Sequence, residues 1–332
     1  MKVFIHYEPR HLTDSFEGTR LRKTLKGACE LVDVPWVDTP QEGVGIAHFL
    51  SPMDMLLLKA QKEAGVKTVI SAFYAEDDPG ASFLKEGKEL RLAPRALEFL
   101  NEADLVLVPD ERMKEFALGH GVTSTLKILE PAVRMNRFSN TAIEKPIFTR
   151  YFGLKPGVKT VVATGSYSDK KTINLIKNVA KSCPNLQFYF FGAKRIVGSL
   201  FLSRMPGRPK NLHFMDLVQD DIYRSALMNS AAYISNDSVR PDVIGALEAF
   251  ASKTQVVAFN SPKPNPLLKA GESCFFFSTA EEMGRYLATL NSDSHQSTIE
   301  PAYAIAKAHN LVSYGKILKG YYEALLQEPI HD

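Results

Sequence analysis

Short apolar runs alternate with amphipathic segments along the whole chain, and this pattern predicts β-strands separated by helices. Apolar runs of about four to eight residues fit strands buried on both faces, and helix-length connections between them fit a parallel sheet. In the first half the runs are residues 2–7, 45–50, 67–74, 103–109 and 126–131. The first half therefore predicts one parallel sheet covered by helices.

The same rhythm restarts in the second half, at residues 159–165, 186–192, 212–217, 231–236 and 254–259. Between the halves, residues 144–157 contain Pro146, Pro156 and two glycines, which is the composition of a linker. The length of 332 residues also exceeds what one hydrophobic core usually organises. We therefore predict an α/β protein with two doubly wound, Rossmann-like domains, residues 1–148 and residues 149–311.

The net charge and the cysteine spacing argue against several classes of protein. A net charge of +3, evenly spread, argues against a nucleic-acid-binding protein. Cys29, Cys183 and Cys274 lack CxxC spacing, so neither a disulfide framework nor a structural zinc site is indicated. The chain starts on a predicted strand rather than an apolar signal region, and no run approaches the about 20 apolar residues that span a bilayer. These features predict a cytoplasmic protein, either soluble or attached to the surface of a membrane.

Residues 233–259 carry the clearest chemical signal, because they are typical of a strand, a ligand-facing loop, a helix and a second strand. Pro241 suits the start of that helix. In the arrangement that this segment resembles, the Glu248 carboxylate can accept hydrogen bonds from vicinal hydroxyls while the helix N-terminus faces phosphate. The alternative is a surface acid on an ordinary amphipathic helix. The first interpretation indicates a nucleotide-sugar site.

Further segments occur in the order typical of one enzyme family, at residues 130–138 (EPAVRMNRF), 159–181, 188–195 (FYFFGAKR) and 313–327. Together with residues 233–259, they make the chain resemble the glycosyltransferase family 4 enzymes. It looks nearest to the glucosyl- and galactosyltransferases of Gram-positive bacteria that act on glycolipids. The resemblance implies the GT-B fold, in which two Rossmann-like domains face a cleft. It also implies that a C-terminal helix, about residues 312–330, crosses back to the first domain.

The resemblance also implies roles for single residues. Lys171 falls on the lysine that holds the donor diphosphate, and Glu248 falls on the carboxylate that binds the ribose. Gly165 and Ser166 correspond to the pair at the end of the first strand of the second domain. Gly18 lies near the glycine-containing loop beside the donor phosphates and the acceptor. These residues form the expected donor site.

A small helix is expected before the strand at residues 231–236. Its first residues include Asp220 and Asp221, which we expect to cap it rather than to take part in chemistry.

The chain also departs from the family pattern. Arg240 stands eight positions before Glu248, where the EX7E motif of the family has its first carboxylate, and Ser166 replaces an arginine. Phe73 or Tyr74 occupies the place of the family's N-domain histidine.

Two interpretations of these departures stay open. Arg240 and Lys171 both neutralise the leaving diphosphate, with Asp242 and Ser166 in secondary roles, or Arg240 pairs with Asp237 or Asp242 on the rim of the site. The first interpretation predicts an active enzyme, and the second predicts a partner subunit.

The function that follows from the resemblance is retaining transfer of a hexose from a UDP-sugar to a glycolipid or a cell-surface polysaccharide. No metal and no other cofactor is expected. The alternative is a catalytically silent GT-B protein that acts as a partner or regulatory subunit of another glycosyltransferase, in a homo- or hetero-oligomer. A Rossmann dehydrogenase is disfavoured because no G-x-G-x-x-G follows the first strand.

Two basic clusters are candidates for contact with an anionic lipid surface on the inner face of the plasma membrane. Both are interpreted as amphipathic helix faces, and solvated helices with leucines in the core are the alternative. The clusters are Arg20, Arg22, Lys23 and Lys26, and Lys85, Lys88, Arg91 and Arg95.

Overall fold

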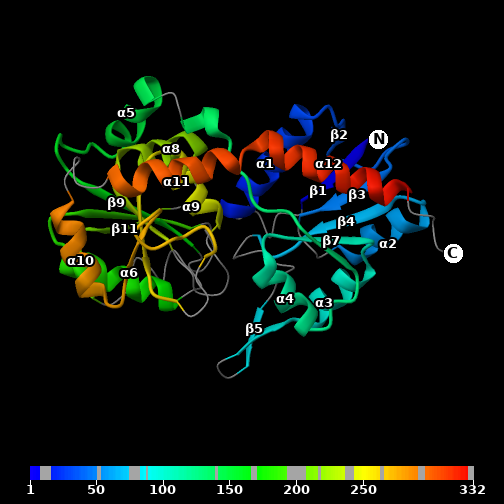
Figure 1. The fold of residues 1–332 in the computed structure, drawn as a ribbon, viewed down its shortest axis with the longest axis horizontal. Coiled ribbons are helices and arrows are strands. Elements are labelled where there is room, and N and C mark those ends of the chain that lie inside the picture. The colour runs from blue at the N-terminus through cyan, green and yellow to red at the C-terminus, as the bar shows by residue number, and fades with distance from the viewer. Residues whose placement is uncertain are drawn as a thin grey trace. The chain divides into compact units, whose positions relative to one another are not determined.

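The computed structural model divides into two compact units, Met1–Ala132 with Leu311–Asp332, and Val133–Asn310. Each unit is built around its own parallel six-stranded sheet (Figure 1). The predicted α/β class with two Rossmann-like domains is confirmed. The structure describes residues 1–7, 16–50, 54–74, 83–86, 89–138, 141–165, 170–192, 207–215, 218–235, 243–261, 265–290 and 296–327.

The first sheet has the strand order β2-β1-β3-β4-β7-β8. Its order reverses beside β1, because β2 lies on one side of that strand and all later strands lie on the other. Its central strands are buried apolar runs, as the sequence predicts for a sheet covered on both faces. The strands are β1 (Val3–His6), β2 (Trp36–Val37), β3 (Ile46–Phe49), β4 (Lys67–Ser71), β7 (Leu105–Val108) and β8 (Thr125–Ile128).

Two hydrophobic clusters cover the two faces of this sheet. One contains side chains of α1 and α12, and the other contains side chains of α2, α3 and α4. The helices are α1 (Phe16–Leu31), α2 (Met55–Glu63), α3 (Pro94–Glu102), α4 (Glu111–Gly119) and α12 (Leu311–Gln327).

The C-terminal helix α12 packs against the first unit beside α1, as the sequence predicts (Figure 1). A buried polar network joins it to the sheet: the Tyr322 hydroxyl lies 2.5 Å from His48 Nδ1, and the Ser71 hydroxyl lies 2.8 Å from His48 Nε2. Tyr321 donates to the carbonyl of Ile128 at 2.8 Å. These bonds fix α12 over the centre of the sheet.

Two glycines of α12 are expected to respond oppositely to alanine. A Cβ at Gly315 would lie 2.9 Å from the Ala28 carbonyl oxygen and 2.9 Å from a methyl of Val32, whereas a Cβ at Gly320 would meet nothing within 4 Å. Gly315→Ala should lower the free energy of unfolding by about 1–3 kcal/mol, because backbone must move. Gly320→Ala should raise it by about 0.5–1 kcal/mol, because it reduces the entropy lost on folding. Urea unfolding of both variants checks this, and equal changes would contradict the close packing of α1 and α12.

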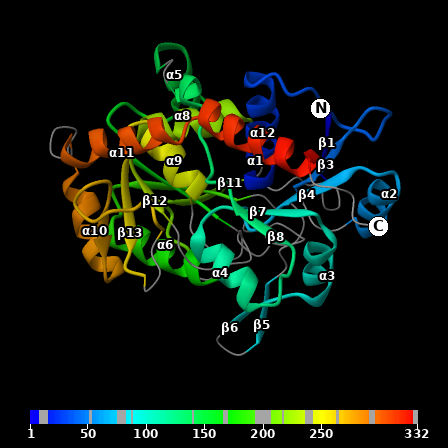
Figure 2. The ribbon, with the colours of Figure 1, turned by 45° about the vertical axis from the view of Figure 1, so that its right-hand side comes forward.

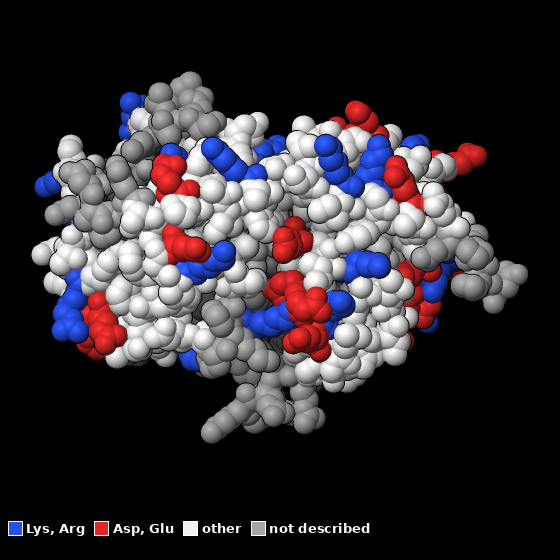
Figure 3. Space-filling model, in the orientation of Figure 1, with Lys and Arg blue, Asp and Glu red and all other residues white. Residues whose placement is uncertain are grey.

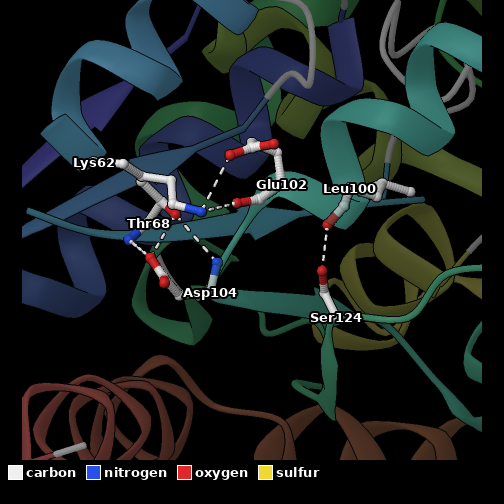
Figure 4. Close-up of polar contacts among 6 residues, drawn as sticks. All are labelled: Lys62, Thr68, Leu100, Glu102, Asp104 and Ser124. Carbon is white, nitrogen blue, oxygen red and sulfur yellow. Dashed lines mark hydrogen bonds and ion pairs between the residues drawn. The ribbon is translucent and has the colours of Figure 1, made fainter. Parts of the chain in front are cut away.

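The amino ends of the strands in the first sheet are tied together by side chains (Figure 4). Thr68 donates to Asp104 Oδ2 through its backbone N–H at 2.6 Å and its hydroxyl at 2.7 Å, which joins the start of β4 to the start of β7. The Lys62 ammonium donates to the Glu102 carbonyl at 2.7 Å, and Ser124 donates to the carbonyl of Leu100 at 2.7 Å. The amino edge is therefore closed by structural bonds, which leaves the carboxyl edge for ligands.

The second sheet has the order β11-β10-β9-β12-β13-β14. The chain builds outward from β9 in one direction and then returns to build outward from β12 in the other, so the order reverses between these two strands. The third strand at that side, β14, was not among the predicted runs. The strands are β9 (Thr160–Thr164), β10 (Gln187–Phe191), β11 (Leu212–Met215), β12 (Ser230–Ser235), β13 (Gln255–Phe259) and β14 (Phe275–Phe277).

The boundary between the units lies earlier in the chain than the predicted position after residue 148. Residues 133–148 belong to the second unit, and much of the expected linker is a helix, α5 (Thr141–Tyr151), which includes Pro146. The cause is tertiary packing. Phe148 is fully buried, its ring lies 4.8 Å from that of Tyr189, and its backbone N–H donates to the Ser225 hydroxyl at 2.8 Å. Its packing overrides the local effect of Pro146.

Helices make up much of the rest of the described part of the second unit. A short 3-10 helix, η2 (Met135–Phe138), precedes α5, and the other described helices are α6 (Lys170–Ser182), α8 (Asp220–Asn229), α9 (Val243–Ala251), α10 (Ala280–Thr289) and α11 (Gln296–Ala308).

The second basic cluster does not form the predicted helix face. Its segment is an antiparallel hairpin outside the main sheet, made of β5 (Phe83–Glu86) and β6 (Glu89–Leu92), and α3 begins only at Pro94 (Figure 2). The period of two in the sequence ELRL explains the strand. Lys88 lies outside the described residues.

The first basic cluster is largely engaged within the first unit. Arg20 is only 5% exposed, and Arg22 and Lys26 both pair with Asp38. The Lys26 ammonium also lies 4.0 Å from the centre of the Trp36 ring. These contacts favour the alternative of an ordinary helix whose leucines lie in the core.

The surface charge is mixed. On the face in Figure 3, Lys and Arg side chains lie next to Asp and Glu side chains rather than in separate fields of one sign. None of the described helices combines the length and the apolar character that crossing a bilayer requires.

Candidate functional site

Three of the predicted site residues, Gly165, Lys171 and Glu248, are described by the structure in the second unit. They lie towards the carboxyl edge of its sheet. In open parallel sheets, ligands bind outside the carboxyl ends of the strands, where the strand order reverses. Here that point lies between β9 and β12, and the Thr164 hydroxyl meets the Tyr233 hydroxyl there at 2.6 Å. Gly165 follows Thr164 directly, with φ 157°, and its N–H donates to the Phe191 carbonyl at 3.2 Å. Gly165 therefore lies where a close approach of backbone to ligand is expected.

Glu248 is attached to the same edge through a tyrosine. The Tyr223 hydroxyl of α8 donates to Glu248 Oε2 at 3.0 Å, and the Tyr223 ring packs edge-on against Phe191 with ring centres 5.2 Å apart. Phe191 ends β10 and also accepts from Gly165. Gly165, Phe191, Tyr223 and Glu248 thus form a connected series of contacts at the carboxyl edge.

The helix that carries Glu248 is not amphipathic. Among the nine residues of α9, all described, every one except Glu248 is buried. A helix that is apolar on all sides belongs to a core, and a single carboxylate in it needs polar partners. The alternative of a surface acid on an ordinary amphipathic helix is therefore wrong. Pro241, expected near the start of the helix, lies outside the described residues.

Lys171 is exposed in the first turn of α6. That helix follows β9 after Gly165 and residues 166–169, and its buried face is formed by Ile173, Ile176 and Val179. Its N-terminus therefore lies at the carboxyl side of β9, where the helix dipole and a lysine both favour an anion.

The junction segment η2 is bound to α8, which corrects the expected role of Asp220. Its carboxylate pairs with Arg137 at 2.7 Å instead of capping the helix, and the N-cap residue is Gln219, which makes no capping bond through its side chain. Arg224, only 7% exposed, donates to the carbonyl of Arg137 at 3.3 Å. The Asp221 carboxylate accepts from the adjacent backbone N–H of Ile222. Since the ion pair with Asp220 joins η2 to α8, Arg137 of the EPAVRMNRF segment has a structural role.

Three predicted site residues, Ser166, Arg240 and Asp242, lie outside the described residues. Asp237, the other proposed partner of Arg240, lies outside them too. The two interpretations of Arg240 therefore stay predictions.

In the first unit, Gly18 lies in the first turn of α1, and residues 8–15 lie outside the described residues. Phe73 and Tyr74, at the carboxyl end of β4, are both buried. Phe73 has φ 68°, an unusual value for a bulky residue, and Tyr74 donates to the Leu129 carbonyl at 2.5 Å. The position of the family's histidine is thus filled by packed aromatic rings.

Sequence reasoning missed Tyr223 and Arg224. Both lie in a helix that is buried from Ile222 to Met228, so neither stands out by periodicity. The described residues contain no group of three or more His, Cys, Asp or Glu side chains suited to a metal ion, and the expectation of metal-free chemistry stays a prediction.

Two Rossmann-like units, each with a reversal of strand order, define the GT-B class of fold. Solved structures of this class confirm it. The Anabaena protein HepE in complex with UDP and glucose matches with a TM-score of 0.71 at 13% identity, over 98% of this chain and 100% of that one. A glycosyltransferase from Rickettsia africae matches with a TM-score of 0.65 at 12% identity, over 99% of each chain.

The sequence matches no family model. It is 24% identical to the processive diacylglycerol alpha-glucosyltransferase of Acholeplasma laidlawii, over 98% of this chain and 99% of the relative. The resemblance to glycolipid glycosyltransferases is therefore confirmed along the full chain.

Proposed function

We propose that this protein is a retaining hexosyltransferase that moves a hexose from a UDP-sugar to a glycolipid. The proposal depends on one observation, the position of the Glu248 carboxylate at the carboxyl edge of an open parallel sheet. The Tyr223 hydroxyl holds it there by a hydrogen bond of 3.0 Å to Oε2. A carboxylate there suits the vicinal hydroxyls of a ribose. The full-length likeness to a diacylglycerol glucosyltransferase supports a glycolipid over a polysaccharide as the acceptor.

In this mechanism the bond between the anomeric carbon and the diphosphate breaks, and the acceptor oxygen bonds to the same face of the sugar. The proton of the acceptor hydroxyl passes to the departing phosphate oxygen, which lies on that face. The departing UDP gains negative charge, so its stabilisation is the main task of the protein. Lys171 and the N-terminus of α6 neutralise the diphosphate, Gly165 permits close approach of the backbone, and Glu248 binds the ribose. Arg240 supplies the second cation, in place of the arginine that Ser166 replaces, and Asp242 and Ser166 have secondary roles.

The expected result is release of UDP from UDP-glucose or UDP-galactose, with faster release when a glucosylated diacylglycerol is present in anionic vesicles. A coupled assay for UDP over a panel of donors measures this, and flotation of the vesicles at low and high salt measures membrane association. Absence of UDP release together with retained UDP binding would contradict the enzyme and favour a silent partner subunit. Absence of UDP binding would contradict both.

A further inference from the structure

A buried tyrosine contacts the carboxylate on which the proposed donor site depends. Tyr223 is fully buried, and its hydroxyl donates to Glu248 Oε2 at 3.0 Å across the space between α8 and α9. Hydrogen bonds from a neutral hydroxyl to a carboxylate are among the stronger ones in proteins. We propose that Tyr223 is a positioning residue that holds the Glu248 carboxylate ready for the ribose 2′- and 3′-hydroxyls of a uridine nucleotide. This inference rests on the proposed function.

The tyrosine is itself fixed from several sides. Its ring packs edge-on against Phe191, at an interplanar angle of 71°. The residue after it, Arg224, donates to the Arg137 carbonyl, and Ser225 accepts from the backbone N–H of Phe148 at 2.8 Å. Because η2, α5 and β10 all hold this turn of α8, the hydroxyl of Tyr223 has little freedom to follow a moving partner.

The fixed hydrogen bond from Tyr223 lowers the conformational entropy that Glu248 loses when a ligand binds. A glutamate side chain has several rotatable bonds, and freezing them when the ligand arrives opposes binding. With the bond from Tyr223 in place, the carboxylate is already oriented in the free protein. A carboxylate has about four acceptor positions, so the bond to Oε2 does not by itself fill the positions that a vicinal diol needs.

The test compares two nucleotides in the full-length protein by calorimetry, UDP and 2′,3′-dideoxyuridine diphosphate. Tyr223→Phe should raise the Kd for UDP about tenfold, in the range of one lost hydrogen bond to a charged group, and leave the Kd for the dideoxy nucleotide unchanged. If the tyrosine only supports the fold, both nucleotides weaken alike, which overturns the inference.

A double-mutant cycle with Glu248→Gln gives an independent measure. Because Tyr223 acts through Glu248, adding Tyr223→Phe to Glu248→Gln should change the Kd for UDP less than twofold, far below the effect in the wild-type background. Full additivity of the two substitutions overturns the inference even if Tyr223→Phe is partly unstable.

The matched control is Tyr322→Phe in the first unit. It also removes a buried hydroxyl that is hydrogen-bonded, here to His48, without touching α8 or α9. It should leave the Kd for UDP unchanged, and a loss equal to that of Tyr223→Phe overturns the inference. If the wild type binds UDP and Glu248→Gln weakens it while Tyr223→Phe does not, the inference alone fails. If the wild type does not bind UDP, the proposed function fails and the inference with it.

Discussion

Replacing Lys171 by alanine is expected to slow UDP release from the donor by about 100-fold to 1,000-fold, the usual effect of removing one group that stabilises charge in the transition state. The lysine is exposed at the start of α6, which follows β9 and Gly165. The charge on the leaving diphosphate grows as the sugar departs, so a cation there lowers the barrier more than it improves ground-state binding. The rate constant should therefore fall more than the affinity for UDP.

Lys181→Ala is the control for this prediction. That lysine is exposed in the last turn of the same helix, so it shares the helix but not the position at the carboxyl edge. Steady-state assays of both variants give kcat and KM separately. Equal and small effects of the two substitutions would contradict a diphosphate site at the start of α6.

Acidification is expected to destabilise the first unit through His48. Burial lowers the pKa of this imidazole from 6.5 to about 3. Below about pH 6.5 the unfolded chain therefore takes up a proton that the folded chain does not, and stability falls with pH until the folded pKa is reached. For this one group, the free energy of unfolding should drop by about 2 kcal/mol between pH 7 and pH 5.

Trp36 provides the measurement, because it is the only tryptophan of the chain and lies in β2 of the first unit. Its fluorescence during urea unfolding at several pH values reports the stability of that unit. His48→Gln keeps a polar side chain but cannot titrate, so the difference between the two pH profiles isolates the histidine. Parallel profiles would show that burial does not hold His48 neutral in the folded protein.

Hydrogen-bonded polar side chains have different roles in the two units. In the first unit, the network of His48, Ser71 and Tyr322 is wholly buried and joins α12 to the sheet. In the second unit, the bond from Tyr223 ends on a carboxylate that is only partly buried. A satisfied buried network stabilises one arrangement of the core, whereas a partly exposed carboxylate with an oriented partner is suited to bind a ligand.

Most of the strands and several residues of the candidate site follow from the sequence alone. Apolar runs predicted every described strand of the two parallel sheets except β2 and β14, because strands buried on both faces must be apolar whatever their neighbours are. The resemblance to glycosyltransferase family 4 indicated Gly165 and Lys171, because both fall on positions of its motif after the first strand of the second domain. Glu248 falls on a position of the family's EX7E motif, and it is the one charge in an apolar helix.

The residues that support these groups follow from long-range packing instead. Residues 133–148 join the second unit because Phe148 packs on Tyr189, a contact between residues far apart in the chain. The pairing of Tyr223 with Glu248 likewise depends on how α8 and α9 lie against β10, and no period or spacing within either helix encodes it. Local patterns fix where elements form, whereas the partners of a side chain follow from long-range packing.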